Sequence, residues 1–125
     1  VTVVFGAGGN RDAAKRPALG AAARGADRIV LTNDNPRDED PQAIVDAIAA
    51  GIGTGSDARA TTVCLDRSEA IFQFFLLCSR DGGGIVILAG KGHETTQTIG
   101  GAVVAQSDRE LALDALQKLQ LLGTA

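Results

Sequence analysis

The sequence is poor in aromatic residues: it has no tryptophan and no tyrosine, and its four phenylalanines are 3% of the 125 residues. So few aromatic side chains argue against a surface on which nucleic-acid bases stack. Basic residues are scattered and the net charge is −3, so neither nucleic acid nor an anionic membrane is indicated as a partner. No apolar run approaches the roughly 18 residues that a membrane span needs. These absences favour a soluble globular protein.

Methionine is absent as well, and Val1 begins inside an expected strand without a basic and apolar leader. We therefore expect a piece of a longer protein, folded as one domain over residues 1–125, with its upstream domains absent. The two cysteines, Cys64 and Cys78, each lie in an apolar segment. They predict buried free thiols in a reducing compartment.

Short apolar runs alternate with segments of helical periodicity along the chain. The runs predict strands at 1–5, 28–32, 61–65 and 85–89, of which the last is the clearest buried strand. Strands that are apolar on both faces and alternate with helices predict a Rossmann-like α/β fold, a mostly parallel sheet with helices on both faces. Residues 99–105, interrupted by two glycines, predict a small C-terminal hairpin.

Turn and cap residues predict where the helices begin. Pro17 suits the first turn of a helix over about 15–24, and Asp40 caps a helix with Pro41 in its first turn. Two capping-box pairs at a spacing of three residues predict the remaining helices: Asp66 with Glu69, and Ser107 with Glu110. The last helix is amphipathic, with Leu111, Leu113, Leu116 and Leu119.

Three polar loops each follow an expected strand: GAGGNRD at 6–12, NDNPRDED at 33–40 and GKGHE at 90–94. The carboxyl ends of parallel strands meet at one edge of the sheet, where open α/β sheets bind ligands. The sequence therefore predicts one site built from all three loops.

Two phosphate motifs fit these loops poorly. GAGGNR lacks the third glycine of a dinucleotide fingerprint because Arg11 occupies that position, which disfavours a nicotinamide or flavin. A P-loop around Lys91 would need glycine at position 85 and Ser or Thr at position 92, where the chain has Ile85 and Gly92. This chain alone therefore lacks an ATP-hydrolysing loop.

The remaining polar groups suit a zwitterion. Arg11 and Arg37 can each form a bidentate pair with a carboxylate, while Asp34 and Glu94 can accept from an ammonium. Asn35 can donate or accept. Asp34 and Asn35 are equally typical turn formers before a proline, and on the residues alone both interpretations stay open.

Other polar residues have plainer interpretations. Asp38, Glu39 and Asp40 are expected to be solvent and helix-cap charges. The lone His93 has no His or Cys at ligand spacing, so a hydrogen bond or substrate contact is favoured over a metal. Lys15 and Arg16 are interpreted as a solvated first helical turn close to the glycine-rich loop at 6–12, called the glycine loop below.

Four motifs together, FGAGGNRDAAKRP, TNDNPRDEDP, AGKGHETTQ and SDRE, resemble the C-terminal domain of the Mur ligases. The similarity is to the branch that adds the third amino acid to UDP-N-acetylmuramoyl-L-alanyl-D-glutamate, and it covers essentially the whole chain. It implies the last of three domains of an ATP-dependent cytoplasmic enzyme of peptidoglycan synthesis. Ala7, Asn10 and Thr95-Thr96 depart from the family pattern without touching its charged positions.

The resemblance also implies roles. DNPR is associated with members that take meso-diaminopimelate, so Arg37 is the discriminating residue. The implied amino-acid pocket is lined by Arg11, Asp34, Asn35, Arg37, Gly90 and Glu94. In it the arginines reach carboxylates, while Glu94 and the Gly90 carbonyl hold the distal amine. Lys15 is a candidate phosphate contact.

The implied reaction uses ATP and Mg²⁺ to convert the nucleotide substrate's carboxylate to an acyl phosphate, which the amine of diaminopimelate attacks. ATP, Mg²⁺ and UDP-N-acetylmuramoyl-dipeptide would be bound mainly by the absent domains, and the isolated domain is expected to be inactive. Two alternatives stay open: a stand-alone zwitterion-binding module, and a dinucleotide-binding domain.

Overall fold

A computed structural model describes residues 1–9, 13–53, 60–91 and 94–123 of the chain. Its centre is a parallel four-stranded sheet in the order β3-β2-β1-β4. The strands are β1 (Thr2–Phe5), β2 (Arg28–Leu31), β3 (Ala60–Val63) and β4 (Val86–Leu88). The chain steps outward from β1 to β3 and then returns to place β4 on the other side of β1. The strand order therefore reverses between β1 and β4, at a topological switch point.

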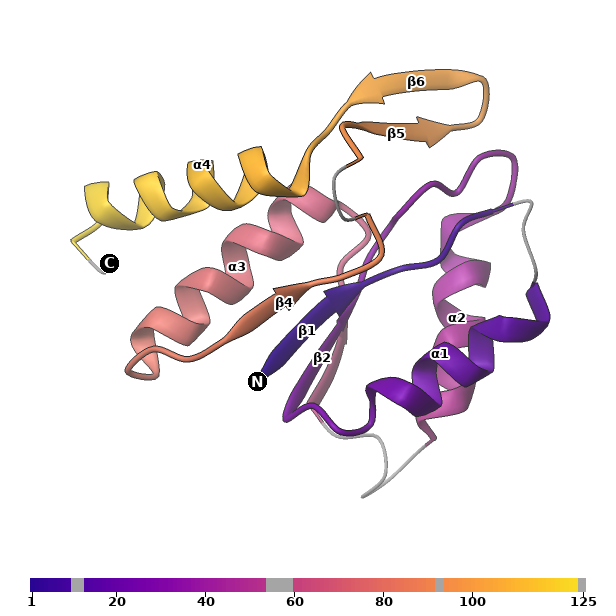
Figure 1. Ribbon diagram of the computed structural model, residues 1–125, viewed down its shortest axis with the longest axis horizontal. Helices are drawn as coiled ribbons and strands as arrows, with labels where there is room; N and C mark the ends of the chain where they lie inside the picture. The colour runs from indigo at the N-terminus through magenta and orange to yellow at the C-terminus, as the bar shows by residue number, and fades with distance from the viewer. Residues whose placement is uncertain (10–12, 54–59, 92–93, 124–125) are drawn as a thin grey trace.

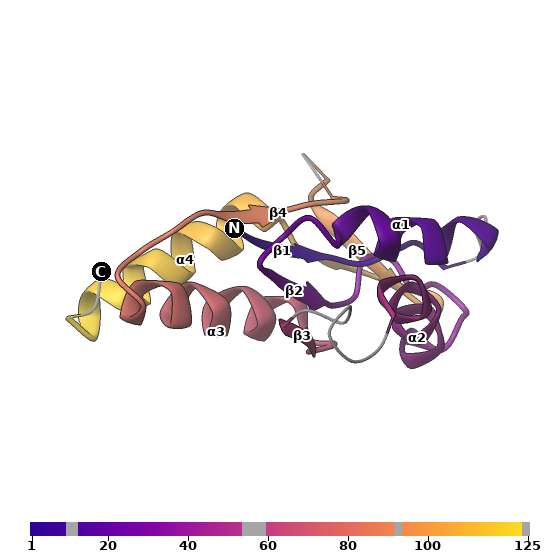
Figure 2. The ribbon, with the colours of Figure 1, turned by 90° about the horizontal axis from the view of Figure 1, so that it is seen from below.

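Four α-helices cover the two faces of this sheet (Figure 1). The helices α1 (Arg16–Ala23) and α2 (Pro41–Ile52) lie on one side, and α3 (Arg67–Arg80) and α4 (Asp108–Leu121) lie on the other. Figure 2, turned by 90°, shows the same separation, and a short 3₁₀ turn, η1 (Ala13–Lys15), precedes α1. The predicted parallel α/β fold with helices on both faces is confirmed.

Two apolar clusters pack the sheet against its helices. Alternate residues of a strand point to opposite faces, so neighbouring residues of β2 join different clusters. The cluster under α1 and α2 contains Phe5, Ile29, Leu31, Ile44, Val45, Ile48 and Ile52. The cluster under α3 and α4 contains Val4, Val30, Ala70, Ile71, Phe74 and Ala115.

Side-chain caps begin three of the helices where the sequence predicts them. The carboxylate of Asp40 accepts from the Gln42 amide at 3.0 Å, and that of Asp66 accepts from the Glu69 amide at 3.1 Å. The Ser107 hydroxyl accepts from the Glu110 amide at 3.4 Å. These bonds satisfy amides that a helix leaves without an internal partner, so each cap sets its helix start.

The prediction that 85–89 is a clearly buried strand is wrong. β4 is an edge strand, and Ile85 and Ile87 are 62% and 47% exposed. Val86 and Leu88 pack against the cluster under α3 and α4, whereas Ile87 points to the opposite face. An apolar run predicts a strand, but it does not tell an edge strand from a central one.

The expected apolar face of the last helix is only half correct. Leu119 is buried and Leu111 packs against the core, but Leu113 and Leu116 are 51% and 45% exposed. Ala115 takes the central buried position because α4 packs closely on α3. The predicted C-terminal hairpin is confirmed as antiparallel β5 (Thr96–Ile99) and β6 (Ala102–Ala105).

Both cysteines are free, as predicted, but they are half-buried rather than buried. Cys64 lies directly after β3, with its Sγ 3.6 Å from the Asp66 carbonyl oxygen. Burial raises the pKa of the Cys64 thiol above its usual value, and the negative charges of Asp66 and Glu69 raise it further. Cys64 is therefore a poor thiolate near neutral pH.

We expect iodoacetamide to alkylate Cys64 at pH 7.5 more slowly than it alkylates free cysteine, because only the thiolate reacts. Folding raises this pKa, so the protonated thiol's contribution to stability is complete below the unfolded pKa and is lost as pH rises through the folded pKa. Mass spectrometry of a Cys78→Ser variant would give the rate at Cys64 alone. A rate equal to that of free cysteine would contradict the prediction.

Candidate functional site

The loops after β1, β2 and β4 meet at the carboxyl edge of the sheet, as predicted. Backbone bonds extend the sheet into these loops, from Thr32 N to the Phe5 carbonyl and from Ala89 N to the Val4 carbonyl, both at 2.9 Å. Gly6 is in close contact with the second loop, because a Cβ built on it would lie 2.1 Å from the Thr32 carbonyl oxygen. The edge is therefore a close-packed set of loops around the switch point.

A buried lysine lies at the centre of the polar groups. Lys91 is 2% exposed, and its Nζ donates to the Thr96 carbonyl and, at 3.5 Å, to Asn35 Oδ1. Nζ also lies 3.7 Å from Asp34 Oδ1 and 3.8 Å from Glu94 Oε1. The sequence did not predict this role, because GKGHE matches a phosphate loop only in part.

Asp34 and Asn35 place their side chains toward this lysine, and Asp34 lies at a bend of the chain before Pro36. The Asn35 amide donates to Glu94 Oε1 at 3.3 Å, and its oxygen accepts from Thr98 N at 2.9 Å. The side chain of Asp34 is 13% exposed, and its Oδ1 has no hydrogen-bond partner among the residues that the structure describes. The two residues before Pro36 therefore belong to the polar cluster around Lys91.

Gly90 borders the same carboxylate. Its φ is +97°, a conformation that favours glycine, and a Cβ built on it would lie 3.4 Å from Asp34 Oδ2. Asp34 and Gly90 face an open pocket of about 460 Å³. The other residues that line it are Gly6, Ala7, Gly8, Lys15, Arg16 and Leu19.

Arg37 occupies an unusual backbone conformation beside the glycine loop. Its φ is +52°, and it is the one non-glycine residue with positive φ in the described part of the chain. Its Nη1 donates to the carbonyls of Gly9 at 2.8 Å and Asn35 at 3.5 Å, and its own amide donates to the Thr98 carbonyl at 3.0 Å. The loop is therefore held between the glycine loop and β5.

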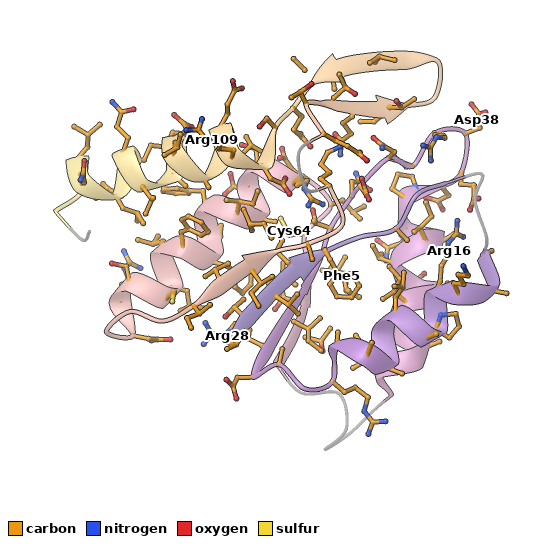
Figure 3. The ribbon with its side chains drawn as sticks, in the orientation of Figure 1. Phe5, Arg16, Arg28, Asp38, Cys64 and Arg109 are labelled. Atoms are coloured by element: carbon orange, nitrogen blue, oxygen red, sulfur yellow. The ribbon has the colours of Figure 1, made fainter. Side chains whose placement is uncertain are left out.

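The prediction that Arg16 and Glu39 are solvated charges is wrong. Arg16, labelled in Figure 3, is 5% exposed and forms a bidentate pair with the Glu39 carboxylate, at 2.8 and 3.0 Å. Its Nη2 also donates to the Gly8 carbonyl at 3.1 Å. A guanidinium can be buried when a carboxylate and a carbonyl accept hydrogen bonds from its N–H groups. This explains why Arg16 is buried and not solvated. Asp38 is exposed, as predicted.

The predicted site residues therefore fall into three groups. Asn35 and Glu94 join Asp34 in the cluster around Lys91, and Gly90 borders it. Arg37 lies beside the glycine loop, and Lys15 is exposed at the rim of the pocket. Arg11 and His93 lie outside the described residues.

This arrangement defines a class: a Rossmann-like α/β domain with polar loops at its switch point, the place where open α/β sheets bind ligands. Residues 1–92 match the family model for the Mur ligase, glutamate ligase domain. The chain belongs to this family. Among the residues described, no helix is long and apolar enough to cross a membrane.

Relatives of known name agree with the family. The chain is 50% identical over 116 residues to the UDP-N-acetylmuramoyl-L-alanyl-D-glutamate–2,6-diaminopimelate ligase of Thermosynechococcus vestitus, covering 92% of the chain and 22% of that enzyme. It is 46% identical over 121 residues to the enzyme of the same name from Gloeobacter violaceus, covering 96% of the chain and 24% of that enzyme. The chain thus spans about a quarter of the length of these relatives.

A solved structure of a protein with the same name has the same fold. It superposes with a TM-score of 0.82 at 37% identity, covering 95% of the chain and 24% of that protein. The family model ends at residue 92, whereas these matches cover 92% or more of the chain. The similarity therefore extends beyond the part that defines the family.

Proposed function

We propose that this chain is the amino-acid-recognising domain of an ATP-dependent ligase that adds meso-diaminopimelate to UDP-N-acetylmuramoyl-L-alanyl-D-glutamate. The observation that carries the proposal is the meeting of Asp34, Asn35, Gly90 and Glu94 at one sheet edge, with Arg37 beside them. Acceptors for an ammonium next to a donor for a carboxylate suit an amino acid with charges of both signs at its distal end.

In this proposal Asp34 and Glu94 accept from the distal ammonium of the amino acid. Asp34 lines the pocket, and its Oδ1 has no hydrogen bond to a described residue. A buried carboxylate oxygen without a donor is costly, so a ligand N–H that reaches it contributes strongly to binding. Lys91 offsets part of the negative charge, because its Nζ is within 4 Å of both carboxylates.

We assign to Arg37 the binding of the distal carboxylate of diaminopimelate. Both side-chain hydrogen bonds that Arg37 makes with described residues come from Nη1. They hold its guanidinium against the glycine loop. The remaining donors can then meet a carboxylate with little loss of entropy. A non-glycine residue at positive φ is strained, and such strain is found preferentially at functional sites. Arg11 is proposed as a second carboxylate contact on the basis of the family resemblance.

The chemistry needs ATP and Mg²⁺, which we assign mainly to the parts of the enzyme outside this chain. ATP supplies the phosphoryl group that activates the nucleotide substrate's carboxylate, and Mg²⁺ neutralises phosphate charge. Lys15 lines this pocket, and its ammonium suits an anionic group rather than a metal. Among the described residues, no group of three or more His, Cys, Asp or Glu side chains is placed to hold a metal ion.

This domain's part in the reaction is to position the attacking amine. The neutral amine nitrogen attacks the acyl carbon, phosphate leaves with the bonding electrons, and the nitrogen loses one proton to the departing phosphate or to water, which gives the amide. Holding the amine in place converts an encounter between molecules into a step within one complex. We propose that residues 1–125 act as one domain of a cytoplasmic enzyme whose other domains bind the UDP-N-acetylmuramoyl-dipeptide and close onto this one.

The test is an assay of the full-length enzyme with the nucleotide substrate, ATP and Mg²⁺. We expect meso-diaminopimelate to be ligated with one ADP released per amide, and lysine to be used at least 10³-fold less efficiently in kcat/KM. The expectation follows from the missing carboxylate, which leaves the half-buried Arg37 without an anion to pair with. Equal use of lysine, or ligation without ADP release, would contradict the proposed function.

A further inference from the structure

We infer that Arg67 is a positioning residue for this amino-acid site, a deeper statement that rests on the proposed function. Arg67 is the first residue of α3, and its side chain is 0% exposed. It forms a bidentate pair with Asp108, from Nε to Oδ1 and from Nη2 to Oδ2, both at 2.7 Å. Its Nη1 donates to the Asn33 carbonyl at 2.8 Å, and Nη2 donates to the Ala89 carbonyl at 3.1 Å.

The two carbonyls lie directly before site residues. Asn33 precedes Asp34, and Ala89 precedes Gly90. They belong to the loops after β2 and β4, which are not neighbours in the sheet because β1 lies between them. One guanidinium therefore bridges the end of β1 and sets the separation of the two loops that carry the ammonium acceptors.

Asp108 fixes the orientation of this guanidinium. It is 4% exposed and begins α4, where a carboxylate is favoured by the helix dipole. The pair uses two of the five N–H donors of Arg67, and the two carbonyls accept from two more, so the plane of the guanidinium is fixed. A lysine could not reproduce this arrangement, since one ammonium cannot reach two carbonyls and both carboxylate oxygens.

Stability alone does not explain this buried pair. Replacing a buried ion pair by apolar residues of similar volume is often neutral or stabilising, whereas removing one partner is strongly destabilising. Arg67 does not line the pocket, in contrast to Arg16, which forms the comparable pair with Glu39. Arg67 therefore acts on the ligand through the backbone of Asn33 and Ala89 and not by contact.

The test compares full-length variants for the KM of each substrate. In Arg67→Met/Asp108→Leu both charges are removed together, so the fold is kept while the link between the loops is lost. We expect the KM for meso-diaminopimelate to rise at least tenfold, with the KM for ATP changing less than twofold and Tm staying within a few degrees of the wild type. Displacing a bound group by about 1 Å can cost a factor of about 100.

Two further variants complete the design. Arg67→Lys keeps the charge opposite Asp108 but loses the planar guanidinium, and it should raise the KM for meso-diaminopimelate about fivefold or more. This variant tests the inference even if the double variant does not fold. Arg28→Met is the control. It removes a salt bridge to Asp81, 3.2 Å long and at the opposite edge of the sheet (Figure 3), and should leave every KM unchanged.

The inference is overturned if a folded Arg67 variant keeps the wild-type KM for meso-diaminopimelate, or if the KM for all substrates rises together as Tm falls. Failure of the proposed function looks different, because the wild-type enzyme itself would then not ligate meso-diaminopimelate. If the wild type ligates another amino acid, the ratio of variant to wild-type KM for that amino acid tests Arg67 in the same way.

Discussion

Replacing Arg37 with alanine in the full-length ligase is expected to raise the KM for meso-diaminopimelate by a factor of about 30 to 1,000. The estimate follows from the roughly 2–4 kcal/mol that is lost when one partner of a buried, hydrogen-bonded charge pair is removed. Lysine has no distal carboxylate, so its KM should change by less than about threefold. Steady-state kinetics with both amino acids would measure the loss of discrimination. An equal loss for both would contradict the assigned role.

Arg37→Gly is the matched variant, because it also removes the guanidinium but accepts the backbone conformation. Arg37 has φ +52°. The left-handed region costs a non-glycine residue about 1–2 kcal/mol, while the greater freedom of glycine in the unfolded chain costs about 0.4–1 kcal/mol. The glycine variant should therefore unfold at a slightly higher temperature than the alanine variant, with the same loss of discrimination. A lower unfolding temperature would show that strain at Arg37 is not significant.

Replacing Gly9 with alanine is expected to lower kcat/KM for meso-diaminopimelate by more than about 100-fold. A Cβ on Gly9 would lie 1.8 Å from the Pro36 carbonyl oxygen and 2.5 Å from its carbon, so the two loops would have to separate. Separation would break the bond from Gly9 N to the Asn35 carbonyl, 2.7 Å long, and the bond from Arg37 to Gly9. Overpacking of this kind costs about 1–3 kcal/mol of stability.

Gly25→Ala is the control for this prediction. Gly25 has no positive φ, and a Cβ on it would meet nothing within 4 Å. Its kcat/KM should equal that of the wild type, and its Tm should be unchanged or slightly higher, because alanine restricts the unfolded chain. A Gly9→Ala enzyme with wild-type kcat/KM would show that the contact between the two loops does not set the site.

Much of the fold could be predicted because its signals are local. The caps at Asp40, Asp66 and Ser107 act within three residues of themselves, and each begins a helix as expected. The meeting of the polar loops followed from topology, since parallel strands end at one edge. Local patterns of this kind predict helices, strands and the edge at which a ligand binds.

The ion pairs could not be predicted because their partners are distant in sequence. Arg16 and Glu39 are 23 residues apart, and Arg67 and Asp108 are 41 apart. A charged residue in a first helical turn has the same local pattern whether its partner is water or a buried carboxylate. The prediction that β4 is buried was wrong for a related reason, since the order of strands in the sheet decides which strand lies at an edge. Lys91 was missed because its acceptors come from several loops.

The hairpin contacts with the site have a consequence for how this family can diverge. Thr96 and Thr98 meet Lys91, Asn35 and Arg37 through main-chain atoms, and Gly100 bonds to the Arg37 carbonyl through its amide. Among the contacts between described residues, Gln97 uses its side chain, donating to the Asp34 carbonyl at 2.8 Å. Main-chain hydrogen bonds do not depend on the side chain, so residues of β5 can be substituted during evolution while the loop at 33–40 keeps its conformation. Gln97 is the β5 position at which such a substitution would alter the loop.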